Sequence, residues 1–197
     1  MDTRIKAVKF NETEHKYYYN GKELRGVTGA IGRIMGKSFP DTDVVKLATM
    51  YGSDVHKEVE NYFNQNGNWF NDTKLSTEGA EWIVDELKDF CSFVCERPMN
   101  IENEVTISDF EGTASKVDIV LRTRDGKAYL FDIKTTSKFD REYCSLQLSV
   151  YKKLYESCYD EKVEGMYVLG TKDKRRFRIL NQSESRVNKI LDMNKAI

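Results

Sequence analysis

Apolar residues recur at helical spacing in two segments of the first half of the chain. The first segment covers residues 43–67 and the second covers residues 80–94, shortly before Pro98. Spacings of three and four residues place apolar side chains on one face of a helix, and a helix ends before a proline. We therefore predict two amphipathic helices, of which the first could bend at Gly52.

The N-terminal segment is expected to hold short strands followed by a short helix. Residues 4–10 resemble a strand, and Asn20-Gly21 separates two further strand-like runs. Asn-Gly is a strong signal for a tight hairpin turn. Thr28 is a residue type that caps helices, so we predict a helix from there through Met35.

After Pro98 the pattern changes from helical spacing to the period of two that marks strands. We predict strands over residues 100–108, 113–123, 127–134, 162–170 and 175–180, and helices over residues 141–155 and 183–194. This order indicates a mixed α/β (α+β) fold with a small central sheet flanked by helices.

Composition narrows the class of protein. A chain of 197 residues with 40% hydrophobic and 32% charged residues is typical of a single soluble globular domain. The net charge of -1 means that a nucleic-acid partner would need a local basic patch. No apolar run approaches the roughly 18 residues of a membrane span, and the N-terminus lacks a signal-peptide shape. We therefore expect a cytoplasmic protein without a membrane partner.

The cysteines do not suggest a metal site. They form no C-x-x-C pair, which argues against a zinc ribbon. We expect buried free thiols and no disulfide. The positions are Cys91, Cys95, Cys144 and Cys158.

Residues 116–134 carry the strongest candidate chemistry. They read as two apolar strands around an Asp-Gly turn, with Asp118 in the first strand and Asp132 and Lys134 at the end of the second. Carboxylates are rare in apolar strands unless something neutralises them. A divalent cation would do so, since Mg²⁺ is typically held by one or two carboxylates plus water and phosphate oxygens. The alternative is a structural Asp–Lys pair at a strand end.

Strand alternation decides which of these side chains can meet. It places Asp132 and Lys134 on the same face, and a hairpin would bring Asp118 towards Asp132. A strict two-residue turn would instead set Asp118 opposite Ile133, so a bulge or a longer turn is required for the two acids to share a face. The face opposite Asp118 is predicted to hold Val117, Ile119 and Leu121.

Two helical segments offer further candidates. His56 lies at the edge of an apolar stripe, and neutral imidazole is a good metal ligand. Glu60, one turn on, could support His56 as a metal ligand, or could simply form a hydrogen bond with a partly buried helix histidine.

Gln147 and Tyr151 share one face of the predicted helix 141–155. A buried amide needs a partner, which would be the backbone, a water on a metal ion or a nucleic-acid base. His15 has no comparable context.

These residues resemble the PD-(D/E)XK nuclease superfamily in its RecB-like branch, which includes nuclease domains of recombination helicase-nucleases, CRISPR-associated adaptation nucleases and small phage exonucleases. The family pattern is a helix with G-x-x-x-H, a strand with G-x-x-D, a D/E-x-K strand and a helix with Q-x-x-x-Y. The chain supplies, in this order, Gly52 to His56, Ser115 to Asp118, Asp132 to Lys134 and Gln147 to Tyr151. Residues 15–31 also resemble the N-terminus of phage members.

The resemblance implies a restriction-endonuclease-like catalytic core over residues 43–197 of a single domain, with residues 1–42 as an N-terminal hairpin and short helix. It implies one or two Mg²⁺ or Mn²⁺ ions. The implied ligands are His56, Asp118, Asp132 and the backbone carbonyl of Ile133. Catalytic roles would fall to Asp118, Asp132, Lys134 as the group that positions or activates water, and Gln147 and Tyr151 as organisers of the site. Glu104 or Glu102 would supply a supporting acid.

The sequence departs from the family in two places. Many relatives bind an iron–sulfur cluster through one early and three clustered late cysteines, and the cysteines here do not match, so we expect no iron–sulfur cluster. Ser115 stands where the family often has glycine, and the nearest glycine is Gly112, which leaves the strand register open.

The expected function is a metal-dependent DNA nuclease of a bacterial or phage-infected cell. We expect an exonuclease on DNA ends or single strands, in recombination, repair or phage DNA processing. A structure-selective endonuclease is one alternative, and a non-catalytic module that partners a recombination protein or inhibits a defence system is another. DNA is the expected partner, together with a recombination or single-strand-binding protein.

One basic segment is the candidate surface for nucleic-acid contact. The alternative is a solvated edge strand, because lysine in particular protects sheet edges. The residues proposed to bind nucleic acid are Lys172, Lys174, Arg175 and Arg176.

Overall fold

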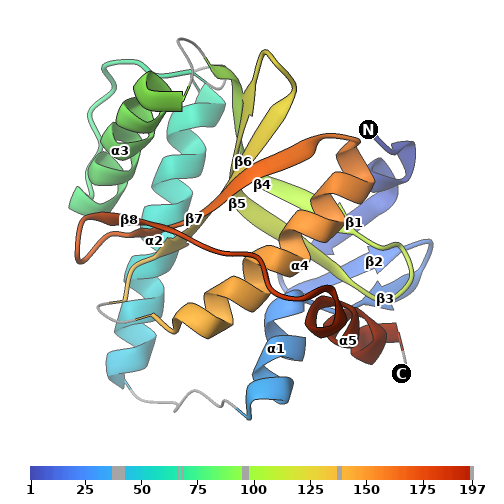
Figure 1. The fold of residues 1–197 in the computed structure, drawn as a ribbon. Helices are drawn as coiled ribbons and strands as arrows, with labels where there is room; N and C mark the ends of the chain where they lie inside the picture. The colour runs from blue at the N-terminus through green and yellow to red at the C-terminus, as the bar shows by residue number, and fades with distance from the viewer. Residues whose placement is uncertain (37–42, 66, 68, 95–97, 137–138, 196–197) are drawn as a thin grey trace.

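The computed structural model describes residues 1–36, 43–65, 67, 69–94, 98–136 and 139–195, which form two β-sheets and the helices around them (Figure 1). The predicted mixed α/β fold with a small central sheet is confirmed. The elements are a 3₁₀ helix Thr3–Ala7, β1 Val8–Asn11, β2 Lys16–Tyr19, β3 Lys22–Leu24, α1 Val27–Met35, α2 Asp43–Gln65, α3 Glu78–Val94, β4 Pro98–Ser108, β5 Ala114–Thr123, β6 Lys127–Lys134, α4 Arg141–Tyr159, β7 Lys162–Gly170, β8 Arg175–Arg178 and α5 Glu184–Lys195.

The central sheet has the strand order β4-β5-β6-β7-β8. All neighbouring strands are antiparallel except β6 and β7, which are parallel. Parallel neighbours require a crossover connection, and α4 provides it. The crossover brings α4 against the sheet beside the end of β6.

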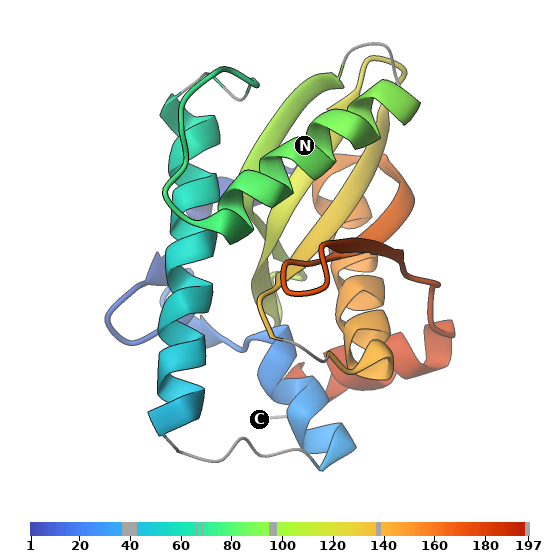
Figure 2. The ribbon, with the colours of Figure 1, turned by 90° about the vertical axis from the view of Figure 1, so that its left-hand side faces the viewer.

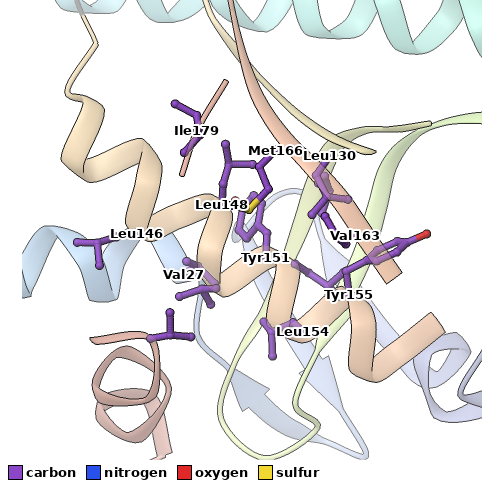
Figure 3. Close-up of a cluster of buried hydrophobic side chains, with 14 of the residues drawn as sticks. Val27, Leu130, Leu146, Leu148, Tyr151, Leu154, Tyr155, Val163, Met166 and Ile179 are labelled. Atoms are coloured by element: carbon purple, nitrogen blue, oxygen red, sulfur yellow. The ribbon is translucent and has the colours of Figure 1, made fainter. Parts of the chain in front are cut away.

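Helices cover both faces of this sheet. α2 and α3 lie on one face and bury a cluster that includes Phe63 and Phe90 (Figures 1 and 2). α4 lies on the other face with α1 and α5. Figure 3 shows side chains of α4, such as Leu148 and Tyr151, among Leu130 of β6 and Met166 of β7. β6 therefore lies between two apolar layers, and the side chain of Asp132 near its end is placed where water is largely excluded.

The first three strands form a separate sheet, β1-β2-β3. The predicted hairpin is confirmed: Asn20 and Gly21 connect β2 to β3 with positive φ angles of 49° and 80°. This sheet is attached to the central unit where the backbone N–H of Arg25 donates to the carbonyl of Gly112 at 2.9 Å and the N–H of Ala114 donates to the carbonyl of Arg25 at 3.0 Å. The small sheet therefore sits beside the start of β5.

Two local predictions near the N-terminus were wrong. Residues 3–7 form a 3₁₀ helix rather than the start of a strand, because Asp2 accepts from the backbone N–H of Arg4 at 2.9 Å and Ile5 is buried. The first helix begins at Val27, with Gly26 rather than Thr28 as its N-cap. The backbone bonds of Arg25 hold the chain in the sheet up to that point.

The cysteines that the structure describes are Cys91, Cys144 and Cys158, and all of them are buried. Cys95 lies outside the described residues. Within the described part of the chain, none of the helices has the length and apolar character needed to cross a membrane.

Candidate metal centre

The turn between β5 and β6 sets the positions of the two central acids. Residues 124–126 form the turn, in which Gly126 has a φ of 78° and its N–H donates to the carbonyl of Thr123 at 3.1 Å. The last pair of the β5–β6 ladder before the acids is Ile119 with Phe131. Continuing that register by one residue sets Asp118 across from Asp132. The turn is thus longer than two residues, as the approach of the two acids requires.

The backbone pairing between β5 and β6 ends at this point, and the side chain of Asp118 provides the next acceptor for a backbone N–H of β6. Its Oδ2 accepts a hydrogen bond of 2.7 Å from the backbone N–H of Ile133. A backbone N–H needs an acceptor when water is excluded. The bond therefore satisfies β6 and also fixes the Asp118 carboxylate.

Glu104 lies beside Asp118 on the neighbouring strand β4, whereas Asp132 lies on β6 at the other edge of β5. In β4 it falls between the pairs Asn103–Ile119 and Val105–Val117, which places it across from Asp118. Its φ is 52°, a left-handed conformation that is uncommon for a non-glycine residue and that concentrates at functional sites. Glu102, the other acid considered from the sequence, instead forms an ion pair of 2.8 Å with Arg122.

His56 of α2 completes a cluster with these two acids. Its Nδ1 lies 3.8 Å from Oδ2 of Asp118. Ligand atoms of His56, Glu104 and Asp118 all lie within 4.8 Å of one another, so the group could hold a metal ion. Glu60, which the sequence offered as a partner for His56, forms an ion pair of 3.0 Å with Lys57.

The surroundings of the two carboxyl groups in this cluster disfavour their negative charges. Burial raises the pKa of Asp118, and the charge of Asp132 adds to the effect, while His56 and Lys134 oppose it. Burial and the nearby Asp118 likewise raise the pKa of Glu104. Two desolvated carboxylates beside an imidazole fit a divalent cation, which would supply the missing charge.

Asp132 lies next to this cluster in a network with α4. It is only 2% exposed, and its Oδ1 accepts from Nε2 of Gln147 at 2.9 Å. The ammonium of Lys134 lies 2.7 Å from its Oδ2 as an ion pair. Burial alone would lower the pKa of Lys134, but Asp132 and Asp118 outweigh burial and raise it. Lys134 therefore stays charged.

The predicted Gln147–Tyr151 pair supports this network. Nε2 of Gln147 donates to the hydroxyl of Tyr151 at 3.0 Å, and the hydroxyl of Ser115 donates to the same oxygen at 3.1 Å. Burial raises the pKa of Tyr151, with Asp132 and Asp118 adding to the shift, so its hydroxyl stays neutral. Ser115 of β5 thus contacts the helix that orients Asp132.

The acidic cluster and the network around Asp132 line one cleft of about 700 Å³. Its central wall holds His56, Glu104, Asp118, Asp132, Ile133, Lys134, Gln147 and Tyr151. Its other wall comes from the small sheet and the start of α1, including Tyr17 and Arg25. From the sequence, His15 of this wall was given no role and Thr28 only a capping role, because no motif distinguishes a strand that faces a site from one that faces solvent.

The structure does not bring the basic segment to this cleft: none of the four predicted contacts lines it. Lys174 forms an ion pair of 2.6 Å with Glu78, and Arg176 forms one of 2.6 Å with Glu86. The ammonium of Lys172 lies 4.9 Å from the ring centroid of Tyr51. Arg175 is exposed on β8. Their contact with nucleic acid stays a prediction.

Comparison with known proteins identifies no family for this chain. No protein-family model matches the chain, and no curated protein sequence matches it. One similar solved structure is a protein from Eubacterium rectale that is provisionally called an exonuclease. It is 14% identical with a TM-score of 0.42, over 87% of this chain and 77% of that chain. A likeness at this level supports neither a shared family nor a shared activity.

Proposed function

We propose that the protein is a metal-dependent DNA nuclease that hydrolyses phosphodiester bonds, acting as an exonuclease on DNA ends or single strands. The observation that carries this proposal is the cluster of His56, Glu104 and Asp118 in a cleft of about 700 Å³, with the Asp132–Lys134 ion pair beside it. Acids that are desolvated and facing a cleft are typical of functional sites.

His56, Glu104 and Asp118 would hold the ion, with Asp132 and the carbonyl of Ile133 as the further ligands implied by the resemblance. One nitrogen and several carboxylate donors suit Mn²⁺ as well as Mg²⁺. When bound, the ion would lower the pKa of a water molecule and offset charge on the phosphate.

The chain's own groups have separate tasks. Lys134 stays protonated beside Asp132 and lines the cleft, so its ammonium can orient a water molecule or attract the phosphate. Gln147 holds Oδ1 of Asp132 and leaves the carboxylate no freedom to turn away. The hydrogen bond from Ile133 does the same for Asp118. Catalysis depends on such fixed placement of charged groups.

The finer assignment follows the sequence motifs. We place the chain in the RecB-like branch of the PD-(D/E)XK superfamily, as a single nuclease domain whose residues 43–197 form the catalytic core. DNA is the proposed partner, and a recombination or single-strand-binding protein is a second one. An iron–sulfur cluster is not part of the proposal.

The proposal is tested with purified protein and end-labelled linear DNA, single- and double-stranded, in Mg²⁺ or Mn²⁺. Release of labelled nucleotides with either ion, and its loss in chelator, supports the proposal. Nicking of closed circular DNA would favour the endonuclease alternative. No cleavage of any substrate, with no thermal stabilisation by Mn²⁺, would favour the non-catalytic module.

A further inference from the structure

Across the cleft from the acidic cluster lies the small N-terminal sheet, which supplies no group to the proposed hydrolysis. Its strand β2 presents Lys16 and Tyr17 to the cleft. Lys16 is tied to Glu23 by an ion pair of 2.8 Å. Tyr17 is half-buried, and its ring packs on Phe10 with 4.7 Å between centroids.

The hydroxyl of Tyr17 makes no hydrogen bond to any residue that the structure describes. The other phenol on the cleft, Tyr151, is bonded to both Gln147 and Ser115. Tyr17 lies close enough to the acidic cluster that Glu104 and Asp118 reinforce the effect of burial in raising its pKa. Because Tyr17 lines the same cleft as Glu104 and Asp118, its hydroxyl is available to a ligand that binds there.

The wall that carries Tyr17 is fixed to the central unit at several points. The backbone bonds of Arg25 join it to β5, and the ammonium of Lys22 donates to the carbonyl of Glu111. The ammonium of Lys116 lies 3.5 Å from Glu104 and 4.6 Å from the ring centroid of Phe10, so it links the acidic cluster to the ring beneath Tyr17. The sheet that carries Tyr17 is therefore held against the central unit beside the acidic cluster.

We propose that Tyr17 is a substrate-contacting residue whose O–H donates a hydrogen bond to a non-bridging oxygen of the phosphate held at the acidic cluster, which makes the N-terminal sheet the substrate-binding wall of the cleft. This inference rests on the proposed nuclease function and extends it to a residue outside the family motifs. A phenol is a neutral donor at physiological pH, so it binds the anion without competing with it for the cation. The cleft has the size of sites that enclose small ligands, so it takes part of one strand rather than a whole duplex.

The test compares wild type with Tyr17→Phe, which removes the hydroxyl but keeps the ring on Phe10. Tyr18→Phe is the matched control. The hydroxyl of Tyr18 donates to Glu14 at 2.8 Å, and Tyr18 does not line the cleft. Turnover of a single-stranded oligonucleotide is measured in Mn²⁺, and the Kd of a fluorescent oligo-dT in Ca²⁺ is measured by anisotropy. Thermal melting checks that both variants stay folded.

A hydrogen bond to a charged group corresponds to about a 10- to 100-fold effect. We expect kcat/KM of Tyr17→Phe to fall by about that factor, mainly through KM, with a matching rise in Kd and with Tyr18→Phe unchanged. Values for Tyr17→Phe within twofold of wild type would overturn the proposal while leaving the nuclease function intact. If wild type binds DNA without cleaving it, the hydrolytic function fails and the ratio of Kd values still decides the role of Tyr17. Absence of DNA binding would overturn both.

Discussion

The Oδ2 atom of Asp118 accepts a 2.7 Å hydrogen bond from the backbone N–H of Ile133, the residue between Asp132 and Lys134. One carboxylate thus serves the sheet and the candidate metal centre together. Substitutions can separate the two tasks, because asparagine keeps an acceptor oxygen and alanine does not.

We expect Mn²⁺ to stabilise wild type against heat, and we predict that Asp118→Asn stays folded but loses this stabilisation. Asp118→Ala should in addition unfold more easily, by about 1–3 kcal/mol, because the N–H of Ile133 is left without an acceptor. Urea unfolding and melting with and without Mn²⁺ measure both effects. Equal Mn²⁺ stabilisation of Asp118→Asn and wild type would remove Asp118 from the ligand set.

The raised pKa values of Glu104 and Asp118 predict how stability depends on pH without metal. A carboxyl whose folded pKa lies above its unfolded value favours folding at low pH, and that contribution is lost as pH rises through the folded pKa. The metal-free protein should therefore lose stability from about pH 4 towards neutrality at these two groups. The raised pKa of Lys134 does not affect this window, since it titrates at far higher pH.

Glu104→Gln should flatten that loss and be more stable than wild type at pH 7 in chelator, by an amount on the order of 1 kcal/mol. The exposed Glu12→Gln is the control and should leave the profile unchanged. Urea unfolding at pH 4.5, 5.5 and 7 gives the comparison. A profile for Glu104→Gln as steep as that of wild type would contradict the assigned cause.

Gly52 permits the close approach of α2 to the end of β6. A Cβ added there would lie 2.9 Å from Oγ1 of Thr135. An alanine in a helix interior is normally favoured over glycine by about 1 kcal/mol, so any loss must come from this contact. We predict that Gly52→Ala weakens Mn²⁺ binding by displacing His56, and that Gly52→Ala with Thr135→Ala restores it. Failure of the double variant to recover would mean that Gly52 acts in another way.

The basic segment is predicted to act through Arg175 rather than Arg176. Arg175→Glu should weaken DNA binding and reduce the salt dependence of affinity by about one counterion. Arg176→Ala should instead lower stability by about 1 kcal/mol, because Arg176 pairs with Glu86 and lies 4.7 Å from the ring centroid of Phe90. Anisotropy at several salt concentrations and urea unfolding distinguish the two. The reverse pattern would show that the α3 contacts are incidental.

Hydrophobic patterning predicted the helices and strands of the central unit well, since α3 buries one clear apolar face and the strands β5 and β6 are largely apolar runs that are buried on both faces. It was wrong about Val117, which packs in the cluster under α4, while Ile119 and Leu121 pack against α2 and α3. Between these residues the β5–β6 ladder ends, and Glu104 of the neighbouring strand β4 has a positive φ. Simple alternation cannot express such a change of face.

The candidate site was predictable in its residue types but not in its geometry. The sequence could not choose between Glu102 and Glu104, because the choice depends on Arg122, which is distant in the chain and pairs with Glu102. It could not decide the length of the turn after β5, which sets Asp118 across from Asp132. Nor could it show that α3 holds acids opposite Lys174 and Arg176. Each of these depends on tertiary contacts between segments far apart in sequence.

The central claim is that the Asp132–Lys134 pair beside the acidic cluster serves hydrolysis. It is tested most directly by the rate at which Lys134→Ala degrades end-labelled linear DNA in Mn²⁺, compared with wild type and with Lys127→Ala, a lysine of the same strand that pairs with Asp125 at 2.7 Å. Our account predicts a loss of at least about 100-fold for Lys134→Ala, with wild-type rates for Lys127→Ala. Equal rates for Lys134→Ala and wild type would contradict it.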